Sequence, residues 1–404
     1  MHVNSGDTAW LLVAAALVMF MTPGLAFFYG GLVRAKNVVG TIMQSFIALG
    51  LVSILWVVVG YTLAFGPDKA GLIGGLTYFG LHGVGAEPST YAPTVPATTF
   101  MVYQMMFAII TPALIAGAFA ERMKFSAYVM FIGLWSILVY APVAHWEWGG
   151  GFLGPSGVGA LDFAGGAVVH ANAGAAALAT AIYLGRRRGH GSDDMSPHNV
   201  PFVILGAGIL WFGWFGFNAG SALTSGALAS SAFVNTQLGA AAGIFGWIIP
   251  ERMRTGKVST VGAATGAVAG LATITPAAGY VEPVGAIAIG LTAGLLCFLA
   301  VSLKDRLGYD DSLDVVGVHM VGGVIGVVLT GVFASLVINP AGAAASLAQV
   351  GKQAVLAGVT VAFSFAATML ILKITELTVG LRVSEEHEDV GLDASQHGEV
   401  GYRI

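Results

Sequence analysis

The sequence predicts an all-α polytopic membrane protein with eleven transmembrane helices. Apolar residues fill 56% of its 404 positions and charged residues only 9%, whereas soluble domains average about 25% charged residues. The apolar residues form runs that are long enough for helices to cross a bilayer. If each run crosses the membrane once, almost all basic residues between the runs fall on one side of the membrane. This asymmetry supports the number of spans and predicts the orientation.

Composition also excludes other classes of protein. A transmembrane β-barrel needs alternating segments of about ten residues, but the apolar runs here are long and continuous. The 17 basic and 21 acidic residues argue against nucleic-acid binding. Cys297 is the one cysteine, so an intrachain disulfide and a cysteine-based metal site are excluded. Residues 1–7 contain no Lys or Arg, so we interpret the first run as a span rather than a cleaved signal.

Charge clusters and turn residues separate the predicted spans. We place the spans near 8–33, 38–65, 98–120, 125–144, 161–185, 199–222, 232–249, 258–276, 283–303, 315–338 and 353–377. The predicted organisation is a membrane domain, 1–377, followed by a cytoplasmic tail, 378–404.

Orientation follows from the basic residues, because cytoplasmic loops of membrane proteins are rich in Lys and Arg. With the N-terminus outside, only Lys69 and Lys352 lie on the outer side. The inner side receives Arg34, Lys36, Arg122, Lys124, Arg186, Arg187, Arg188, Arg252, Arg254, Lys257, Lys304, Arg306, Lys373, Arg382 and Arg403. We therefore expect an N-out, C-in topology.

A weak internal repeat relates the two halves. The segments DFAGGAVVH (162–170) and DVVGVH (314–319) each place an Asp before a central His, at the same position in two blocks of five spans. Because each block has an odd number of spans, the second block crosses the membrane in the opposite orientation to the first. Inverted repeats of this kind place a transport site near the midplane of the bilayer. We expect one repeat at about 8–185, an inverted repeat at about 199–338, and a final helix at about 353–377. Most of the 58 glycines serve close helix packing.

Two of the nine histidines, His170 and His319, lie within the predicted spans, and we place the others in loops, ends or the tail. Ionisable groups at membrane depth are costly and usually line a pathway or pair with each other. Three interpretations remain open for this pair: histidines that line a solute path, histidines that bridge helices structurally, and a bis-His haem or metal site.

Aromatic residues at the outer ends of the spans suggest a cation site. Phe107 lies in the third span, Trp148 follows the fourth within HWEWGGG (145–151), and Phe217 and Ser221 lie near the outer end of the sixth. Aromatic faces attract cations, and a hydroxyl can accept an N–H. The alternatives are an interfacial Trp anchor and a Phe packed in a core.

Six segments, in order over nearly the whole chain, resemble the Amt/Mep/Rh ammonium transporters, and specifically the microbial Amt type. They are TPGLAFFYGGLVRAKN (22–37), GAFAER (117–122), WGGG (148–151), DFAGGAVVH (162–170), GWFGFNAGS (213–221) and DVVGVH (314–319). The resemblance implies eleven spans and a homotrimer with one pore per subunit, in the inner (cytoplasmic) membrane. It implies transport of ammonium or methylammonium, no cofactor and no enzymatic activity.

The resemblance also implies roles for individual residues. It assigns ammonium recruitment to Phe107, Trp148 and Ser221, with Asp162 ordering the site and favouring the cation without direct contact. It assigns a gate to Phe107 and Phe217, and the pore to His170, His319, Leu25, Tyr29, Leu114, Trp214 and Val315. Tyr103, expected at the rim of the outer vestibule, Pro112 and Glu147 depart from the family pattern, and the sequence leaves their effects open.

The expected mechanism recruits ammonium outside, deprotonates it, and passes ammonia through the dry pore. Burying a bare cation costs tens of kcal/mol on a Born estimate. Deprotonating an amine of pKa about 10.4 at pH 7 costs about 5 kcal/mol, so deprotonation is favoured. The proton either returns outside or crosses through the His pair, and the sequence does not distinguish these routes.

The composition of the tail predicts that it is solvated or disordered. Its pattern is similar to the family's cytoplasmic tail, which packs beneath the subunits and meets a PII-type signal protein. On that resemblance Gly391 provides a bend and Asp393 a local cap. The alternative function is an ammonium sensor that acts through a PII-type partner, although we expect no built-in output domain. An Rh-like gas channel is the alternative within the family.

Overall fold

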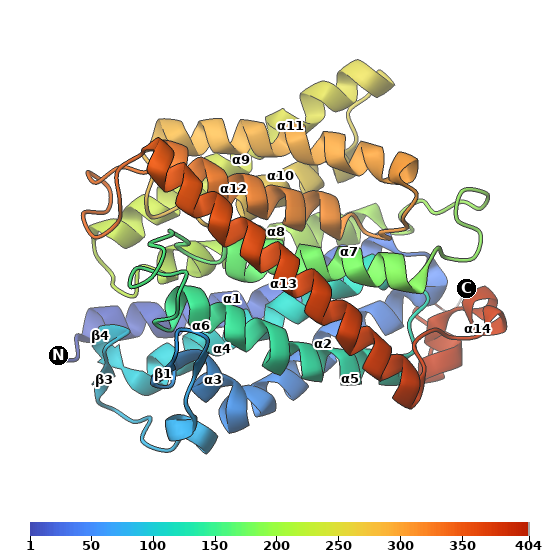
Figure 1. The fold of residues 1–404 in the computed structure, drawn as a ribbon. Helices are drawn as coiled ribbons and strands as arrows, with labels where there is room; N and C mark the ends of the chain where they lie inside the picture. The colour runs from blue at the N-terminus through green and yellow to red at the C-terminus, as the bar shows by residue number, and fades with distance from the viewer. Residues whose placement is uncertain (403–404) are drawn as a thin grey trace.

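The structure is a computed structural model that describes residues 1–402 apart from the side chain of Asp305. Helices make up almost all of its regular secondary structure (Figure 1). The first half contains α1 (Ser5–Leu32), η1 (Ala35–Asn37), α2 (Val38–Leu55), η2 (Trp56–Gly60), α3 (Tyr61–Phe65), η3 (Leu76–Leu81), α4 (Ala97–Ile115), η4 (Ala116–Phe119), α5 (Phe125–Trp135), η5 (Ser136–Tyr140), α6 (Ala141–Trp148), η6 (Gly166–Ala171) and α7 (Asn172–Leu184). Between α3 and α4 lie two small antiparallel hairpins, β1 (Asp68–Lys69) with β2 (Ile73–Gly74) and β3 (Pro88–Ser89) with β4 (Ala92–Pro96).

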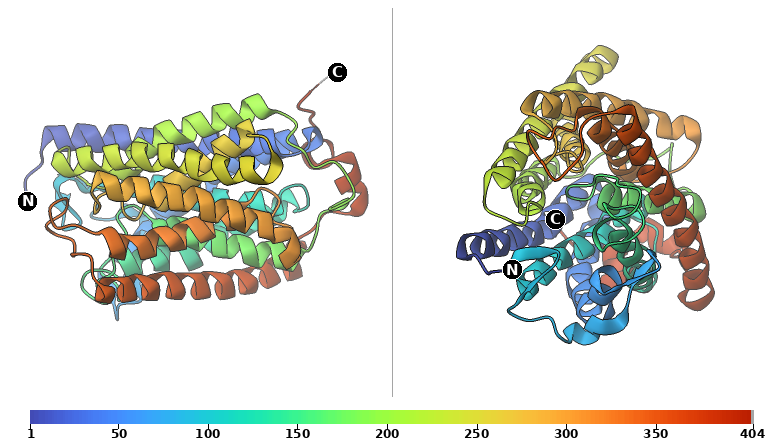
Figure 2. Two further views of the ribbon diagram at one scale, coloured as in Figure 1. Left: turned by 90° about the horizontal axis from the view of Figure 1, so that it is seen from above. Right: turned by 60° about the vertical axis from the view of Figure 1, so that its left-hand side comes forward.

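The second half has the same helical character and ends in a folded tail. It contains α8 (Val200–Gly220), α9 (Ala227–Thr255), α10 (Thr260–Ile274), α11 (Pro283–Leu307), η7 (Val316–Met320), α12 (Val321–Phe333), α13 (Leu347–Val379), α14 (Glu385–Val390) and η8 (Asp393–His397). The helix α13 crosses the bundle diagonally (Figure 1). The two termini lie at opposite ends of the bundle (Figure 2). We call the end with the tail the tail end, and the end with the hairpins the loop end.

Ten helical stretches in the described residues are long and apolar enough to cross a membrane. The eighth predicted span, 258–276, corresponds to α10, which is apolar but shorter. Its 15 residues extend about 23 Å, less than the hydrocarbon core of about 30 Å. The chain is thus a multi-pass helical membrane protein, while the count of eleven spans and the orientation stay predictions. Arg403, one of the predicted inner residues, lies outside the described residues.

The first helices of the two repeats pack face to face through glycines of α8. A Cβ on Gly206 would lie 2.2 Å from the backbone N of Phe28 in α1, and a Cβ on Gly213 would lie 2.2 Å from Cγ of Met21. No larger side chain fits without moving the helices apart. Small residues therefore set the α1–α8 separation, as in other membrane helix pairs.

The fourth predicted span was drawn too short. It continues through α6 to Trp148, so His145 is not in a loop but fully buried in a helix. The His145 ring contacts the carbonyl of Ala64 through Nδ1 at 2.8 Å and the Asp68 carboxylate through Nε2 at 2.9 Å. The predicted span ended before His145 because a polar residue usually marks the end of a span. In the structure these two hydrogen-bond partners compensate for the burial of the His145 ring and connect α6 to the β1 strand.

The two repeats share an aspartate at the start of a π-helical segment, although the sequence pairing of Asp162 with Asp314 was wrong. The Asp162 carboxylate accepts the amide of the fifth residue after it, Ala167, at 2.8 Å. In the second repeat Asp311 accepts the amide of the fifth residue after it, Val316, at 2.7 Å. Each of these aspartates lies eight residues before its central histidine. Asp314 instead has a positive φ of 63° and pairs with Lys304.

The tail is folded, so the interpretation from its composition was wrong. Leu392 donates its amide to Asn37 at 2.8 Å, and Gly391 takes a φ of +104° to reach this position. The Asp393 carboxylate accepts the amides of Val39 and Gly40 at 3.0 and 2.8 Å. Asp393 is therefore a cap of the distant helix α2 rather than a local one.

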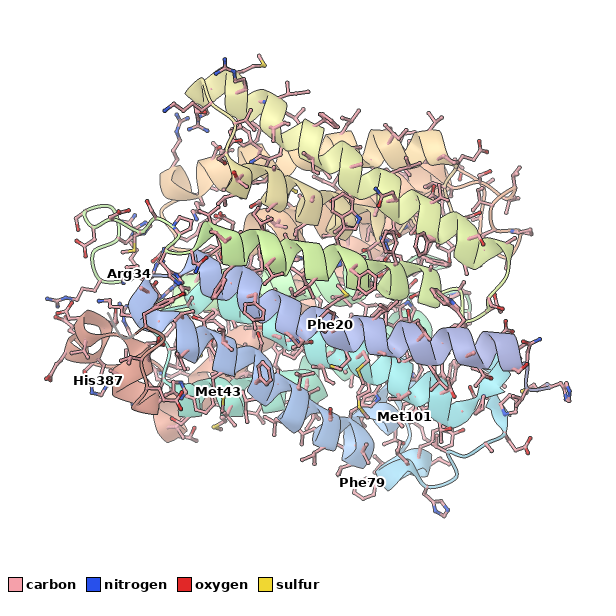
Figure 3. All side chains as sticks on the ribbon, turned by 180° about the vertical axis from the view of Figure 1, so that it is seen from behind. Phe20, Arg34, Met43, Phe79, Met101 and His387 are labelled. Carbon is pink, nitrogen blue, oxygen red and sulfur yellow. The ribbon has the colours of Figure 1, made fainter. Side chains whose placement is uncertain are left out.

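Basic residues near the start of α2 hold the tail in place. Lys36 donates Nζ to the carbonyls of Glu388 and Asp389 at 2.9 and 2.6 Å. Arg34 and the tail residue His387 lie at the same end of the bundle (Figure 3). Composition cannot reveal this docking, because the polar side chains of the tail find their partners on helices far away in the sequence.

Asp311 provides a test of this packing through pH. It is buried, one of its oxygens has no hydrogen-bond partner in the described part of the chain, and burial raises the pKa of its carboxyl to about 6. A carboxyl whose pKa rises from 3.8 on folding destabilises the fold when ionised. The penalty is absent below about pH 4, grows between pH 4 and 6, and stays complete above about pH 6, where it amounts to about 3 kcal/mol.

We expect Asp311→Asn to raise the melting temperature in detergent at pH 7.5, because the neutral amide avoids this penalty. The difference from the unmodified protein should shrink toward pH 4.5. Thermal unfolding across this pH range measures it, with the exposed Glu87→Gln as a control that should change nothing. A difference that does not vary with pH would contradict the assignment.

Candidate functional site

A cavity of about 210 Å³ opens at the loop end. We call it the loop-end cavity. It is lined by Phe65, Tyr91, Phe100, Gln104, Phe107, Glu147, Trp148, Pro155, Ala160, Asp162, Phe163, Ser221, Leu223 and Tyr280. All four residues assigned to recruitment from the sequence line this one cavity, although they come from separate parts of the chain: Phe107, Trp148, Asp162 and Ser221.

The two aromatic rings of this group are fixed at right angles. Their centroids lie 6.1 Å apart with an interplanar angle of 86°. Trp148 donates its indole N–H to the backbone carbonyl of Asp162 at 2.9 Å. Because that N–H is occupied, Trp148 offers the cavity only its ring, which is the part that attracts a cation.

Ser221 presents a hydroxyl oxygen to the loop-end cavity. Its hydroxyl reaches the carbonyl of Phe217 at 2.9 Å, and with the proton directed there the oxygen can accept an N–H. The Tyr103 hydroxyl lies 3.1 Å from the Ser221 oxygen and also reaches the carbonyl of Phe217 at 2.8 Å. Tyr103 is fully buried, so it supports Ser221 from behind rather than standing at the rim of the cavity.

Asp162 holds the start of η6. One carboxylate oxygen accepts the amides of Gly165 and Gly166 at 2.8 and 2.6 Å, and the other accepts those of Ala167 and Val168 at 2.8 and 3.0 Å. These amides would otherwise be unpaired, as at any helix start. The side chain is thus committed to the backbone and orders the segment that carries His170.

The two phenylalanines assigned to the gate close the floor of the loop-end cavity. Phe107 and Phe217 are both buried, and their rings lie 4.3 Å apart between centroids at an angle of 40°. Thr111 donates to the carbonyl of Phe107 at 2.6 Å, one residue before Pro112, and α4 continues through the proline to Ile115. Pro112 therefore does not end the helix that carries the gate.

Beyond the gate lies a narrow pocket of about 10 Å³, which has space for about one water molecule. We call it the histidine pocket. Its lining is Met21, Leu25, Phe28, Ile110, Leu114, Val169, His170, Leu210, Trp214, Phe217, Val268 and His319. Apart from the histidines and the indole of Trp214, these side chains are apolar. The indole N–H is taken by Thr275 at 2.8 Å.

The two histidines are in direct contact. Their Nδ1 atoms lie 3.2 Å apart, and the rings are nearly parallel, with centroids 5.2 Å apart. One Nδ1 must carry a proton and the other must accept it. The ring of His170 also stacks on Trp214 at 5.4 Å, and its Nε2 has no hydrogen-bond partner in the described residues.

The distance of 3.2 Å between the two Nδ1 atoms lies within hydrogen-bonding range. A metal would need further ligands, because two histidines do not complete a coordination shell. No group of three or more His, Cys, Asp or Glu side chains within residues 1–402 has metal-binding geometry. The contact between the rings supports a shared proton instead.

The assigned pore-wall residues divide into two groups. Leu25, Leu114 and Trp214 line the histidine pocket. Tyr29 and Val315 meet at Gly117 on the tail side, where an added Cβ would lie 2.7 Å from each side chain. The Tyr29 hydroxyl donates to the carbonyl of Leu114 at 2.9 Å, which links the two groups.

Sequence reasoning missed two glutamines of α13 that position the site. Gln353 is fully buried, accepts the amide of Leu161 at 2.7 Å and donates to the Leu161 carbonyl at 2.7 Å. Gln349 donates to the carbonyl of Gly159 at 3.1 Å. Together they fix the chain next to Asp162. The two glutamines could have been identified from the sequence, because they are polar residues inside an apolar span. The same criterion identified the two histidines.

The tail end has a larger polar cavity of about 680 Å³, which the sequence did not reveal. Arg186, Arg187, Lys304 and Asp314 are among its lining residues. Arg187 is held by Asp310 at 2.9 Å, so part of this basic charge is already paired. The cavity is a polar space on the opposite side of the histidine pocket from the loop-end cavity.

The chain matches known proteins over nearly its whole length. The sequence profile described as the Ammonium Transporter Family matches residues 9–402. An ammonium transporter of Bacillus subtilis is 50% identical over 99% of both chains, and Ammonium transporter Amt1 of Archaeoglobus fulgidus is 46% identical over 99% of this chain and 100% of that protein.

Solved structures agree with these sequences. The crystal structure of Mep2 from Saccharomyces cerevisiae matches with a TM-score of 0.90 and 36% identity, covering 95% of this chain and 90% of the other. A structure titled Sensor Amt Protein also has a TM-score of 0.90, at 30% identity over 97% of this chain and 98% of the other. The apolar spans, the paired histidines and these matches together show that the chain belongs to the ammonium transporter family.

Proposed function

We propose that this protein recruits ammonium at the outer surface of the cytoplasmic membrane, deprotonates it, and passes ammonia through the histidine pocket. The observation that carries this proposal is the order of three features along one path. A cavity lined by aromatic rings and carboxylates is followed by two phenylalanines whose rings are in contact, and then by a narrow pocket that contains two touching histidines.

Recruitment uses rings and one hydroxyl. A cation within about 6 Å of an aromatic centroid gains about 2 kcal/mol or more where water is excluded. The perpendicular rings of Phe107 and Trp148 offer such a position, and the lone pairs of Ser221 accept one N–H. The same contacts accept methylammonium, which retains N–H donors.

The histidine pocket favours the neutral solute. Its apolar lining cannot replace the water around a cation, and burying a bare ion costs tens of kcal/mol. Deprotonation near pH 7 costs about 5 kcal/mol for an amine of pKa about 10.4. Ammonia can then donate to, or accept from, the edges of the histidine rings, including the unpartnered Nε2 of His170.

The loop end faces outward in this proposal, because the basic residues of the sequence gather at the tail end. Large apolar side chains such as Phe20, Phe212 and Phe245 are exposed on the bundle and suit contact with lipid or with other subunits. Family membership supports a homotrimer with one pore per subunit, and we propose that residues 1–377 form the transport domain with a regulatory tail at 378–404.

The twin histidines provide the test of this path. We expect unmodified protein in proteoliposomes to give a transient ammonium-specific current if the proton crosses through the pair. Replacing both His170 and His319 with Leu should then reduce that current to the level of empty liposomes, because no ring is left to carry the proton. Solid-supported membrane recordings with ammonium pulses at fixed pH measure it.

A control variant, Lys257→Gln in an exposed connection, should keep the full current. A double variant that is correctly assembled and retains the current of the unmodified protein would rule out the relay. Absence of current from the unmodified protein, together with a rise in internal pH on ammonium addition, would instead indicate neutral ammonia conduction.

A second role, regulation by a PII-type signal protein at the tail end, is favoured by the docked tail. The tail places acidic residues next to basic ones on the tail-end surface, including an ion pair between Arg188 and Asp389 at 2.8 Å. A surface of this kind suits a protein partner. The similarity to a structure titled Sensor Amt Protein keeps sensing through such a partner as the alternative function.

We expect a PII-type protein to be retained by the full-length chain and lost when residues 378–404 are removed, because the docking surface includes the tail. A pull-down of the PII-type protein under one fixed buffer condition measures retention. Asp393→Asn, which weakens the cap on α2, should reduce retention by a smaller amount. Equal retention with and without the tail would contradict a tail-centred site.

A further inference from the structure

Each histidine of the pair is followed four residues later by a buried glycine. Gly174 follows His170 and lies in α7, and Gly323 follows His319 and lies in α12. In both repeats the aspartate that begins the π-helical segment, the histidine and this glycine have the same spacing, eight residues and then four. The internal repeat therefore extends past the histidines and includes these two glycines.

The glycine of each repeat faces the backbone next to the histidine of the other repeat. A Cβ on Gly174 would lie 2.3 Å from the backbone N of Met320, which follows the second histidine. A Cβ on Gly323 would lie 2.6 Å from the backbone N of Ala171 and 3.0 Å from the Cβ of His170. Because backbone atoms make the closest contacts, no change of side-chain rotamer could relieve them. The two histidine segments thus cross at two points, each of which requires a glycine.

Little else fixes the distance between the two histidine rings. Within residues 1–402, the only hydrogen bond of either ring is the one to the other ring, between the Nδ1 atoms of His170 and His319. Trp214 stacks on the ring of His170 but donates its N–H to Thr275 rather than to a histidine. The separation of the rings therefore depends on how closely the two segments approach each other.

The glycine crossings hold the segments at the separation that the histidine contact needs. The two Nδ1 atoms lie 3.2 Å apart, near the upper limit for a hydrogen bond. Non-bonded carbon atoms prefer a separation of about 3.5–4.0 Å, so a methyl group at either glycine would push the facing backbone away by about 1 Å. Even half of this shift would take the ring nitrogens out of hydrogen-bonding range.

We propose that Gly174 and Gly323 are the positioning residues of the histidine pair and decide whether a proton can pass from one ring to the other. The inference rests on the proposed relay through the pair and identifies the residues that set its distance. In the transfer, the N–H bond at one Nδ1 atom breaks as the N–H bond at the other forms, and no electrons are exchanged between the rings.

A purely structural role for the two glycines makes a different prediction, which Gly290 of α11 can test. A Cβ on Gly290 would lie 2.4 Å from the carbonyl oxygen of Gly239, and its three nearest atoms all belong to α9. A methyl group there crowds the backbone as severely but contacts neither histidine segment. Gly290→Ala is therefore the matched control for general damage to helix packing.

The experiment combines a structural measurement with a transport measurement on assembled protein in liposomes. Solid-state NMR of protein labelled with nitrogen-15 histidine should show a cross-peak between the two Nδ1 nuclei, and His170→Leu should remove it. Gly323→Ala should also lose the cross-peak and should lower the ammonium-evoked current at least about tenfold, because a misplacement of about 1 Å can cost about a hundredfold in rate. Gly290→Ala should lower the melting temperature but keep the cross-peak and the current.

An unchanged cross-peak and current in Gly323→Ala would overturn the inference, and so would an equal loss in Gly290→Ala. Loss of only one of the two signals in Gly323→Ala would overturn it as well. If Gly323→Ala does not assemble, Gly174→Ala takes its place with the same criteria, because it presses on the other histidine segment. Failure of the proposed relay is separate, since the unmodified protein would then give no current and the cross-peak alone would decide the role of the glycines.

Discussion

The Asp162 carboxylate is the constraint on which the rest of the site depends. It accepts four consecutive backbone amides at the start of η6 and so fixes the segment that carries His170. Its own backbone carbonyl accepts the indole N–H of Trp148. Asp162 thereby connects Trp148 in the loop-end cavity to the segment that carries His170 in the histidine pocket. Gln353 of α13 secures the preceding residue, so the helix outside the two repeats also supports the site.

The path narrows where charge would be most costly. The loop-end cavity has space for several small molecules, the phenylalanine pair closes its floor, and the histidine pocket has space for about one water. Two features make this narrowness compatible with polar groups. The histidines satisfy each other through their Nδ1 contact, and the indole of Trp214 is bound by Thr275. The remaining lining offers a cation no replacement for its hydration shell, whereas the neutral solute that we propose would need only one deprotonation to enter.

Much of this arrangement could be predicted from the sequence. Apolar runs and Gly-rich packing gave the bundle, and the resemblance selected residues that the structure brings into one path, such as Phe107, Trp148, His170 and His319. Other features depend on partners distant in the chain. His145 was placed after the fourth span because its hydrogen-bond partners, Ala64 and Asp68, belong to another span and its loop. Asp314 was mistaken for the repeat partner of Asp162, although Asp311 has the same eight-residue spacing to its histidine, and the hydrogen bond to Val316 identifies Asp311 as the partner. The tail was interpreted as solvated because its cap on α2 joins residues more than 350 positions apart.

The central claim is that the solute crosses the histidine pocket without its charge, and a cation that cannot lose a proton tests it most directly. The measurement is uptake of radioactive rubidium, a monovalent ion close to ammonium in size, compared with labelled methylammonium in the same proteoliposomes. The account predicts protein-dependent methylammonium uptake and rubidium uptake no greater than in empty liposomes. Protein-dependent rubidium uptake at a comparable rate would show that an intact cation passes and would contradict the account.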